Sequence, residues 1–483
     1  MTKAGFAIAE YHDIKEIYRK IDILLSQPIL PLKKEALDKY LRWFDENCSK
    51  SKALITKAKD VIPGGVQHNL AFNYPFPLAF NKAQGAYLWD IDGNRYIDFL
   101  QSGGPTVLGS NYPTVKEKIL ELLNSCGPST GLFHEYEYKL AEFICSHLPA
   151  VDRYRALGSG TEAAMAAVRV ARAATGRKKI IKIGGAYHGW SDQLNYALNI
   201  PRTGRFQSHG IPRGTTAHTQ EVPPNNLNAL EWKLKFNQLR GGTAAVILEP
   251  LGPESGTRPV AFDFNQNVRD LCNKYGALLI FDEVVTAFRL GISGAQGYFN
   301  VLPDLTIFGK VVSGGYPAAG GLGGRRDLMQ YLAAGVEGIK KRAKVGGTLS
   351  ANPLSCAAGY YTMLEIEKTN ACAKAGAAGD RLTVGLQKII TSYDLPYVAY
   401  NQGSICHLET SGVILMNLGL NILKSLKEIK ARKKMMEEMG AAYMAEGLVT
   451  LAGSRMYTSM ADIDEVIDDA LKRFEKVLAQ ADK

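Results

Sequence analysis

Residues 277–282 read ALLIFD, and residues 305–310 read LTIFGK. Each stretch is a short, mostly apolar run that is followed at once by a charged residue, Asp282 in the first and Lys310 in the second. Runs of this length are typical of parallel strands that are buried on both faces. Because ligands bind beyond the carboxyl ends of such strands, the two runs predict an α/β fold with Asp282 and Lys310 at one binding edge.

An acid and an amine at the same edge suit one cofactor in particular. Pyridoxal phosphate requires a lysine for its Schiff base and a carboxylate close to its pyridine nitrogen. Taken alone, a lysine such as Lys310 in a glycine-rich loop is more typical of a solvated surface, and Asp282 of a helix cap. The hypothesis therefore depends on further segments of the chain.

A glycine-rich segment supplies the features of a phosphate site. Residues 158–163 read GSGTEA and precede a run of strong helix formers. The N–H groups at the start of a helix face an anion, and the helix dipole adds attraction. Ser159, Gly160 and Thr161 are the candidate donors, although the spacing of Ser159 and Glu162 is also that of an ordinary capping box.

Two loops supply the remaining features. Residues 184–190 read GGAYHGW and follow a strand-like run at 179–183. Tyr187 at such a strand end can stack on a flat heteroaromatic ring, whereas His188 alone is more typical of a hydrogen-bonded structural histidine. Residues 346–353 read GGTLSANP and form a turn-rich loop with hydroxyl and amide donors.

Together these segments resemble the class III aminotransferase family of fold-type I pyridoxal-phosphate enzymes, and within it the glutamate-1-semialdehyde 2,1-aminomutases. The resemblance spans roughly residues 50–480 and implies a doubly wound, mostly parallel large domain with a smaller α+β domain. The stretches that carry it are IPGGV at 62–66, DIDGNRYID at 90–98, GSGTEA at 158–163, YHG at 187–189, FDEV at 281–284, GK at 309–310 and GTLSANP at 347–353.

The resemblance implies how the chain treats the cofactor ring. Lys310 is expected to form the Schiff base and then to carry the substrate proton as general base and acid. Asp282 is expected to pair with the pyridinium nitrogen. Tyr187 is expected to cover one face of the ring and Val284 the other.

The resemblance also implies how the phosphate is held. Ser159, Gly160 and Thr161 are expected to bind it through backbone and hydroxyl groups. Thr348 is expected to reach the phosphate of a neighbouring subunit, so that the site requires a homodimer. Glu283, beside Asp282, is as consistent with a polar group that fixes its loop as with a part in the chemistry.

Composition bounds the class of protein. The chain has 483 residues, 46% of them hydrophobic, which is enough for a large core and more than one domain. No apolar stretch approaches the roughly 20 residues of a membrane span, and no signal-peptide core is present. Seven cysteines without C-x-x-C spacing predict reduced thiols, no metal site and a cytoplasmic location. The net charge of +10 is not accompanied by any nucleic-acid-binding motif, so no nucleic-acid partner is expected.

Patterning divides the chain into four parts. Helices are expected over 13–25 and 36–44 in the first part, and a hairpin turn is expected at Asp92-Gly93 in the second. The last part ends in a helix with an Asp462 cap. The parts are a helical extension at 1–60, the N-terminal part of a small domain at 61–99, a cofactor-binding large domain at 100–345, and a connecting helix with the C-terminal small domain at 346–483.

Three departures from the aminomutase pattern bear on the substrate. Residues 67–72, which include His68, carry no arginine where aminomutases bind a carboxylate, Gly103 replaces a bulky residue, and Glu254 replaces an asparagine. A free α-carboxylate normally requires a bidentate arginine partner. We therefore expect a transaminase that moves the amino group of a β- or ω-amino substrate to a keto acid such as 2-oxoglutarate or pyruvate. An aminomutase and an amino-acid racemase of the same fold are the alternatives.

A basic cluster precedes Thr348 on a loop that is expected near the site entrance. It comprises Lys340, Lys341, Arg342 and Lys344. A solvated loop is the ordinary interpretation. Four cations also suit the phosphates of a large anionic substrate. A β-aminoacyl-coenzyme A such as 3-aminobutyryl-coenzyme A combines a masked carboxylate, bulk and phosphates, and some members of the family act on such thioesters.

Overall fold

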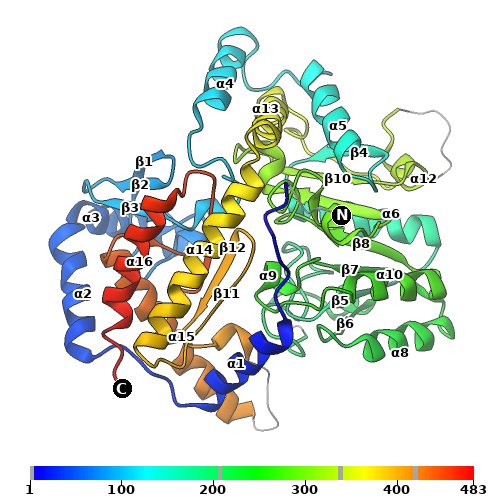
Figure 1. Ribbon diagram of the computed structural model, residues 1–483. Helices are drawn as coiled ribbons and strands as arrows, with labels where there is room; N and C mark the ends of the chain where they lie inside the picture. Colours follow the sequence, from blue (N-terminus) through cyan, green and yellow to red (C-terminus); the bar gives the residue numbers. More distant parts are fainter. Residues whose placement is uncertain (1–4, 205–208, 336–340, 417–421) are drawn as a thin grey trace. The chain divides into compact units, whose positions relative to one another are not determined.

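Figure 1 shows a computed structural model of the chain, which describes residues 5–204, 209–335, 341–416 and 422–483. Contacts divide the chain into two units. The first comprises residues 1–11 and 113–372, and the second comprises residues 12–112 and 373–483. The second unit is thus assembled from two stretches that are far apart in the sequence. The domain boundaries expected after residues 60, 99 and 345 stay predictions.

A seven-stranded sheet forms the centre of the first unit (Figure 1). Its strands pair in parallel except for β10, which is antiparallel to both of its neighbours. In spatial order the strands are β4 (Arg153–Leu157), β10 (Gly320–Gly324), β9 (Leu305–Gly309), β8 (Leu278–Asp282), β7 (Thr243–Leu248), β5 (Lys179–Ile183) and β6 (Thr219–Val222).

The two runs that open the sequence argument are neighbouring strands of this sheet. β9 has the predicted bounds, and β8 begins one residue later than the predicted run and ends on Asp282. The two strands pair in parallel, with Asp282 opposite Ile307. All five residues of β9 are buried, as a strand covered on both faces requires. Asp282 and Lys310 therefore lie at the carboxyl ends of adjacent strands, and the expected α/β fold is confirmed.

Helix α6 (Gly160–Thr175) packs closely on this sheet because its buried face consists of small residues, five alanines and two valines. Ser159 caps the helix, and Gly176 ends it in a left-handed conformation. The other main helices of the unit are α4 (Pro113–Ser125), α5 (Glu135–His147), α8 (Leu227–Gln238), α10 (Phe264–Tyr275) and α13 (Pro353–Thr369).

The second unit has two smaller sheets. Strands β1 (Phe80–Gln84), β2 (Tyr87–Asp90), β3 (Arg95–Asp98) and β13 (Leu448–Val449) form one, and β11 (Val398–Gln402), β12 (Ile405–Glu409) and β14 (Arg455–Tyr457) form the other. β2 and β3 make the predicted hairpin. The helices of the unit are α1 (Ile14–Ser26), α2 (Lys34–Asn47), α3 (Ser49–Ala58), most of α14 (Ala371–Ser392), α15 (Ile422–Ala445) and α16 (Asp464–Leu478).

The predicted cap of the last helix is wrong. Asp462 does not cap α16, which begins at Asp464 after Ile463. The Asp462 carboxylate instead accepts the backbone N–H of Ser459 at 2.6 Å and its hydroxyl at 2.8 Å. The acid therefore closes the turn that precedes the helix, where its acceptors satisfy donors three residues upstream.

Three negative findings hold for the described part of the chain. No helix there is long and apolar enough to cross a membrane. No group of three or more histidine, cysteine, aspartate or glutamate side chains is arranged to hold a metal ion. No disulfide joins any of the seven cysteines, all of which lie in the described ranges, and five of them are buried.

Candidate active site

Asp282 is a buried carboxylate at the end of β8 with two donors. Its Oδ2 atom accepts a hydrogen bond from Nδ1 of His188 at 2.7 Å, and its Oδ1 atom accepts the backbone N–H of Val284 at 3.1 Å. Burial lowers the pKa of His188, although Asp282 opposes the shift. A neutral imidazole that donates through Nδ1 leaves Nε2 as an acceptor, and Nε2 is buried without a partner among the described residues.

Lys310 follows β9 directly and starts a short 3₁₀ turn, Lys310–Ser313. Its backbone φ is 50°, in the left-handed region that a non-glycine residue seldom adopts. Such a conformation costs roughly 1–3 kcal/mol and persists where the surroundings enforce it, often at functional sites. The chain thus turns sharply at the residue whose amine is expected to hold the cofactor.

The start of α6 has the features of an anion site. The N–H groups of Gly160 and Thr161 are the first two of a sixteen-residue helix and have no acceptor within it. The Ser159 hydroxyl caps the helix by accepting the N–H of Glu162 at 3.2 Å, and Glu162 in turn accepts the N–H of Gly158 at 2.9 Å. The cap and the anion site therefore coexist, because they use different N–H groups.

Val284 links the Asp282 loop to the other two parts of the site. A Cβ atom added to Gly160 would lie 2.9 Å from Cγ2 of Val284, and one added to Gly309 would lie 2.9 Å from Cγ1. Both glycines are required by this close approach. The structure therefore brings together Val284, the first residue of α6 and the residue before Lys310.

The loop after β5 carries Tyr187, His188 and Gly189 to the same edge. Gly189 has a φ of 84°, and an added Cβ would lie 2.4 Å from Oγ1 of Thr161, so the loop touches the start of α6. His188 reaches Asp282, as described above. The Tyr187 side chain is about half exposed (49%). Burial of the remainder and the carboxylates of Glu254 and Asp282 raise the pKa of its phenol above the usual value.

Glu249, one residue beyond β7, is a buried carboxylate that sequence reasoning missed as a site residue. Its Oε1 atom accepts the N–H of Tyr187 at 3.2 Å and the N–H of Glu254 at 2.8 Å, and its Oε2 atom accepts the N–H of Ser255. Glu254 and Ser255 are both in the left-handed region. Burial, the nearby Asp282 and Glu254 raise the pKa of Glu249 to about 7. Its position beyond an apolar strand was the signal available in the sequence.

Glu283 fixes its loop. Its buried carboxylate accepts the Thr286 hydroxyl at 2.9 Å, the N–H of Ala295 at 2.6 Å and the side-chain amide of Gln296 at 3.0 Å. Burial raises its pKa. Of the two interpretations that the sequence left open, the geometry favours the structural one.

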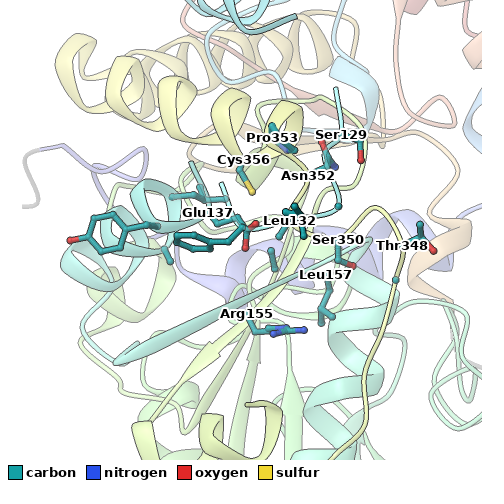
Figure 2. Close-up of a pocket in the computed structure, with 18 of the residues that line it drawn as sticks. Ser129, Leu132, Glu137, Arg155, Leu157, Thr348, Ser350, Asn352, Pro353 and Cys356 are labelled. Atoms are coloured by element: carbon teal, nitrogen blue, oxygen red, sulfur yellow. The ribbon is translucent and has the colours of Figure 1, made fainter. Parts of the chain in front are cut away.

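Thr348 lies in the loop at 346–353. It lines a cavity of about 560 Å³ between the loop that carries Leu132, strand β4 and the loop at 346–353. Figure 2 shows Thr348 at one side of this cavity, away from Cys356 and Glu137. The Thr348 side chain is exposed. Its expected role toward a neighbouring subunit stays a prediction, and a Cβ added to the adjacent Gly347 would lie 3.3 Å from Oε2 of Glu162 in α6.

The remaining expected substrate residues are spread over both units. His68 and Gly103 belong to the second unit, where His68 is exposed and caps a short turn by accepting the N–H of Leu70. Gly103 has a φ of 86°, so its backbone alone favours glycine. Lys341 and Arg342 are exposed in the first unit, and Lys340 lies outside the described residues.

Asp282 and Lys310 thus lie at adjacent strand ends, and the start of α6 is suited to an anion. A sequence model of the family described as Aminotransferase class-III matches residues 71–478. The chain belongs to this family and is a pyridoxal-phosphate-dependent enzyme of the transaminase class.

The relatives that the chain matches have several activities. It is 41% identical over 367 residues, 74% of this chain and 82% of the relative, to a glutamate-1-semialdehyde 2,1-aminomutase of Legionella pneumophila (strain Corby). Among solved structures it is similar to an omega-transaminase from Sphaerobacter thermophilus (TM-score 0.79, 26% identity, 90% and 98% of the two chains). It is also similar to a β-phenylalanine aminotransferase from Variovorax paradoxus (TM-score 0.78, 25% identity, 92% and 96%).

The residues present fit the cofactor of the family. The α6 start offers N–H donors of the kind that bind phosphate, and Asp282 offers a carboxylate that is oriented by His188. Gly160 and Gly309 keep the space beside Val284 free of side-chain atoms of their own. The anion site after β4, the acid at the end of β8 and the amine after β9 thus follow the carboxyl ends of three strands of one sheet.

Proposed function

We propose that Lys310, Asp282, Ser159, Gly160 and Thr161 hold pyridoxal phosphate in this chain, with Tyr187 and Val284 at its ring. Pyridoxal phosphate supplies an aldehyde that bonds to amines and a ring that accepts the electrons left when a neighbouring carbon loses a proton. The N–H groups of Gly160 and Thr161 bind the phosphate oxygens.

Asp282 keeps a proton at the ring nitrogen, and His188 keeps Asp282 oriented through their 2.7 Å hydrogen bond. The Lys310 amine would hold the cofactor and, when free, would take up and return the substrate proton at Nζ. Val284, packed on Gly160 and Gly309, covers one side of the site and excludes water there.

We infer that the substrate is a β- or ω-amino compound and that the amino group passes to a separate keto acid such as 2-oxoglutarate. The observation that carries this proposal is that two carboxylates act on Tyr187, that of Asp282 at the end of β8 and that of Glu254 in the loop after β7. Like charges repel, so a free α-carboxylate next to the reacting carbon is disfavoured there. In a β- or ω-amino acid the carboxylate lies at least one carbon further away.

A β-aminoacyl-coenzyme A, such as 3-aminobutyryl-coenzyme A, extends the same reasoning, since its carboxylate is masked as a thioester. The exposed Lys341 and Arg342 supply cations for its phosphates. A comparison of the thioester with free 3-aminobutyrate tests this form of the substrate. Equal rates on both, or an unchanged KM for the thioester in the double Ala variant of Lys341 and Arg342, would remove it.

An aminomutase is the second candidate, and the relatives named glutamate-1-semialdehyde 2,1-aminomutase favour it. The two functions differ in where the nitrogen goes. The test incubates the amino form of the cofactor-loaded enzyme with 2-oxoglutarate or pyruvate and measures new free amino acid. A second sample contains glutamate-1-semialdehyde alone. Amino acid formed in the first sample supports the transaminase, whereas isomerisation in the second without transfer in the first supports the aminomutase.

Glu254→Asn tests whether the carboxylate of Glu254 selects the substrate. Asparagine tolerates the left-handed backbone that Glu254 adopts, so the turn should survive. Removing this charge should improve activity on α-amino acids relative to β-amino acids. An unchanged preference would show that Glu254 does not select the substrate.

We also propose that the working enzyme is a homodimer in the cytoplasm. Leu132 and Phe133 are each 79% exposed beside the cavity that Thr348 lines, and apolar surface of this kind favours a second copy of the chain. Light scattering should report a dimer for the wild type and a monomer for Phe133→Glu. Leu239→Glu, at an exposed site (85%) beyond the end of α8, is the matched control and should stay dimeric.

A further inference from the structure

Lys182 is a fully buried lysine of the first unit. It lies in β5, and its relative exposure is 0%. Its Nζ atom donates hydrogen bonds to three backbone carbonyl oxygens, those of Ala186 at 2.7 Å, Leu194 at 3.3 Å and Tyr196 at 2.7 Å. An ammonium group has three N–H donors, so the three carbonyls match its full capacity.

All three carbonyls belong to one loop, which follows β5 and carries the cofactor residues. Between the first and the second carbonyl lie Tyr187, His188, which donates to Asp282, and Gly189, which touches Thr161. The loop has little regular structure of its own, so its conformation depends on such hydrogen bonds and contacts. Lys182 is therefore the inner anchor of the segment that orients the acid and the aromatic ring.

Charged groups around Lys182 keep its ammonium protonated at neutral pH. Burial lowers the pKa of Lys182 to about 8, while nearby carboxylates oppose the shift. Lys182 in turn contributes to the lowered pKa of His188, after burial. Above this pKa the neutral amine has two hydrogens for three carbonyls, and one hydrogen bond to the loop is lost. The carboxylates that face the ammonium are those of Glu249, Glu221, Glu254 and Asp282.

We propose that Lys182 is a positioning residue of the cofactor site, which acts by holding the loop at 186–196 so that Tyr187 meets the cofactor ring and His188 meets Asp282. This inference rests on the proposed function, because it assigns Lys182 a role toward the same site. The hydrogen bonds of the Lys182 ammonium go to the loop carbonyls of Ala186, Leu194 and Tyr196. Its effect passes through the backbone of the loop.

The test compares cofactor binding by the apoprotein of the wild type, Lys182→Met and Lys182→Gln. Pyridoxal phosphate is titrated in, and the visible absorbance and circular dichroism of the bound cofactor are recorded. Lys179→Met is the matched control, since Lys179 lies on the same strand and also donates to a backbone carbonyl, that of Arg240, but on the surface. Loss of the charged hydrogen bonds should raise the cofactor Kd roughly 10- to 100-fold in Lys182→Met.

The expected pattern separates positioning from a general loss of stability. Lys182→Gln, which keeps two N–H donors, should bind with intermediate affinity, and Lys179→Met should match the wild type. Trp190 lies in the same loop, so the tryptophan fluorescence of the wild-type apoprotein should change as pH rises through about 8, and this change should be absent from Lys182→Gln. If Lys182→Met does not fold, Lys182→Gln and this pH profile decide the matter.

Two results would overturn the inference and are distinguishable from failure of the proposed function. A wild type that binds pyridoxal phosphate together with Lys182→Met or Lys182→Gln of equal affinity would refute the role of Lys182 alone. So would a tryptophan fluorescence whose pH dependence between pH 7 and 9 is the same in the wild type and in Lys182→Gln. A wild type that binds no pyridoxal phosphate would refute the proposed function, and the inference with it.

Discussion

Two substitutions of Asp282 distinguish the contribution of its charge from the contribution of its hydrogen bonds. In Asp282→Ala, two buried donors lose their acceptor, Nδ1–H of His188 and N–H of Val284. A buried donor without an acceptor costs about 1–3 kcal/mol, and removal of a buried charge offsets part of this cost. We therefore expect the free energy of unfolding to fall by about 2–4 kcal/mol.

Asp282→Asn is the matched variant, because its amide oxygen still accepts from His188. It should lose about 1 kcal/mol of stability but carry no charge for the ring nitrogen. Both variants should lose turnover on the order of 10²- to 10³-fold, as when a site loses one preorganised electrostatic group.

Urea unfolding gives the stabilities, and single-turnover absorbance of the bound cofactor gives the rates. Asp282→Asn with a rate within about tenfold of the wild type would refute the role of this carboxylate. Equal stability of Asp282→Ala and the wild type would contradict the stabilising role of the two hydrogen bonds that Asp282 accepts.

Three further predictions concern residues that keep the loops of the site in place. Gly189→Ala should weaken cofactor binding, because its Cβ would meet Thr161 at 2.4 Å; Gly176→Ala, also at positive φ but with open space, should cost only about 1–2 kcal/mol of stability. Both effects are measured by cofactor titration and urea unfolding. Burial raises the pKa of Glu249 to about 7, so its folded form binds a proton more tightly than its unfolded form and its contribution to stability falls as pH rises from about 4.5 to 7. The stability of Glu249→Gln relative to the wild type should therefore increase over that range, and a constant difference would contradict the shift. Glu283→Ala should destabilise the fold by several kcal/mol, since it leaves at least three buried donors without an acceptor, and thermal unfolding checks it.

The elements with regular periodicity could be predicted from the sequence. β5 and β9 have the predicted bounds, and Asp282 ends β8, because an apolar run closed by a charged residue has one natural place in a parallel sheet. The hairpin around Asp92-Gly93 was predictable because its turn residues favour a tight connection.

Contacts between an irregular loop and a buried charge could not be predicted. Lys182 stands in a strand whose pattern was clear, yet its partners are carbonyls 4 to 14 residues further along a loop without periodicity. The 2.7 Å bond between His188 and Asp282 joins residues 94 positions apart and follows from the packing of the loop after β5 against the end of β8. Asp462 was assigned as a helix cap because the same residue type serves a turn equally well.

Covalent attachment of the cofactor tests the central claim most directly. The wild type loaded with pyridoxal phosphate is reduced with borohydride, digested and analysed by mass spectrometry, with Lys310→Ala as the control. We predict a yellow protein whose modified peptide contains Lys310, and no turnover or attachment at that peptide in Lys310→Ala. A colourless wild type that ignores added pyridoxal phosphate, or attachment only at another lysine, would contradict the assignment of Lys310.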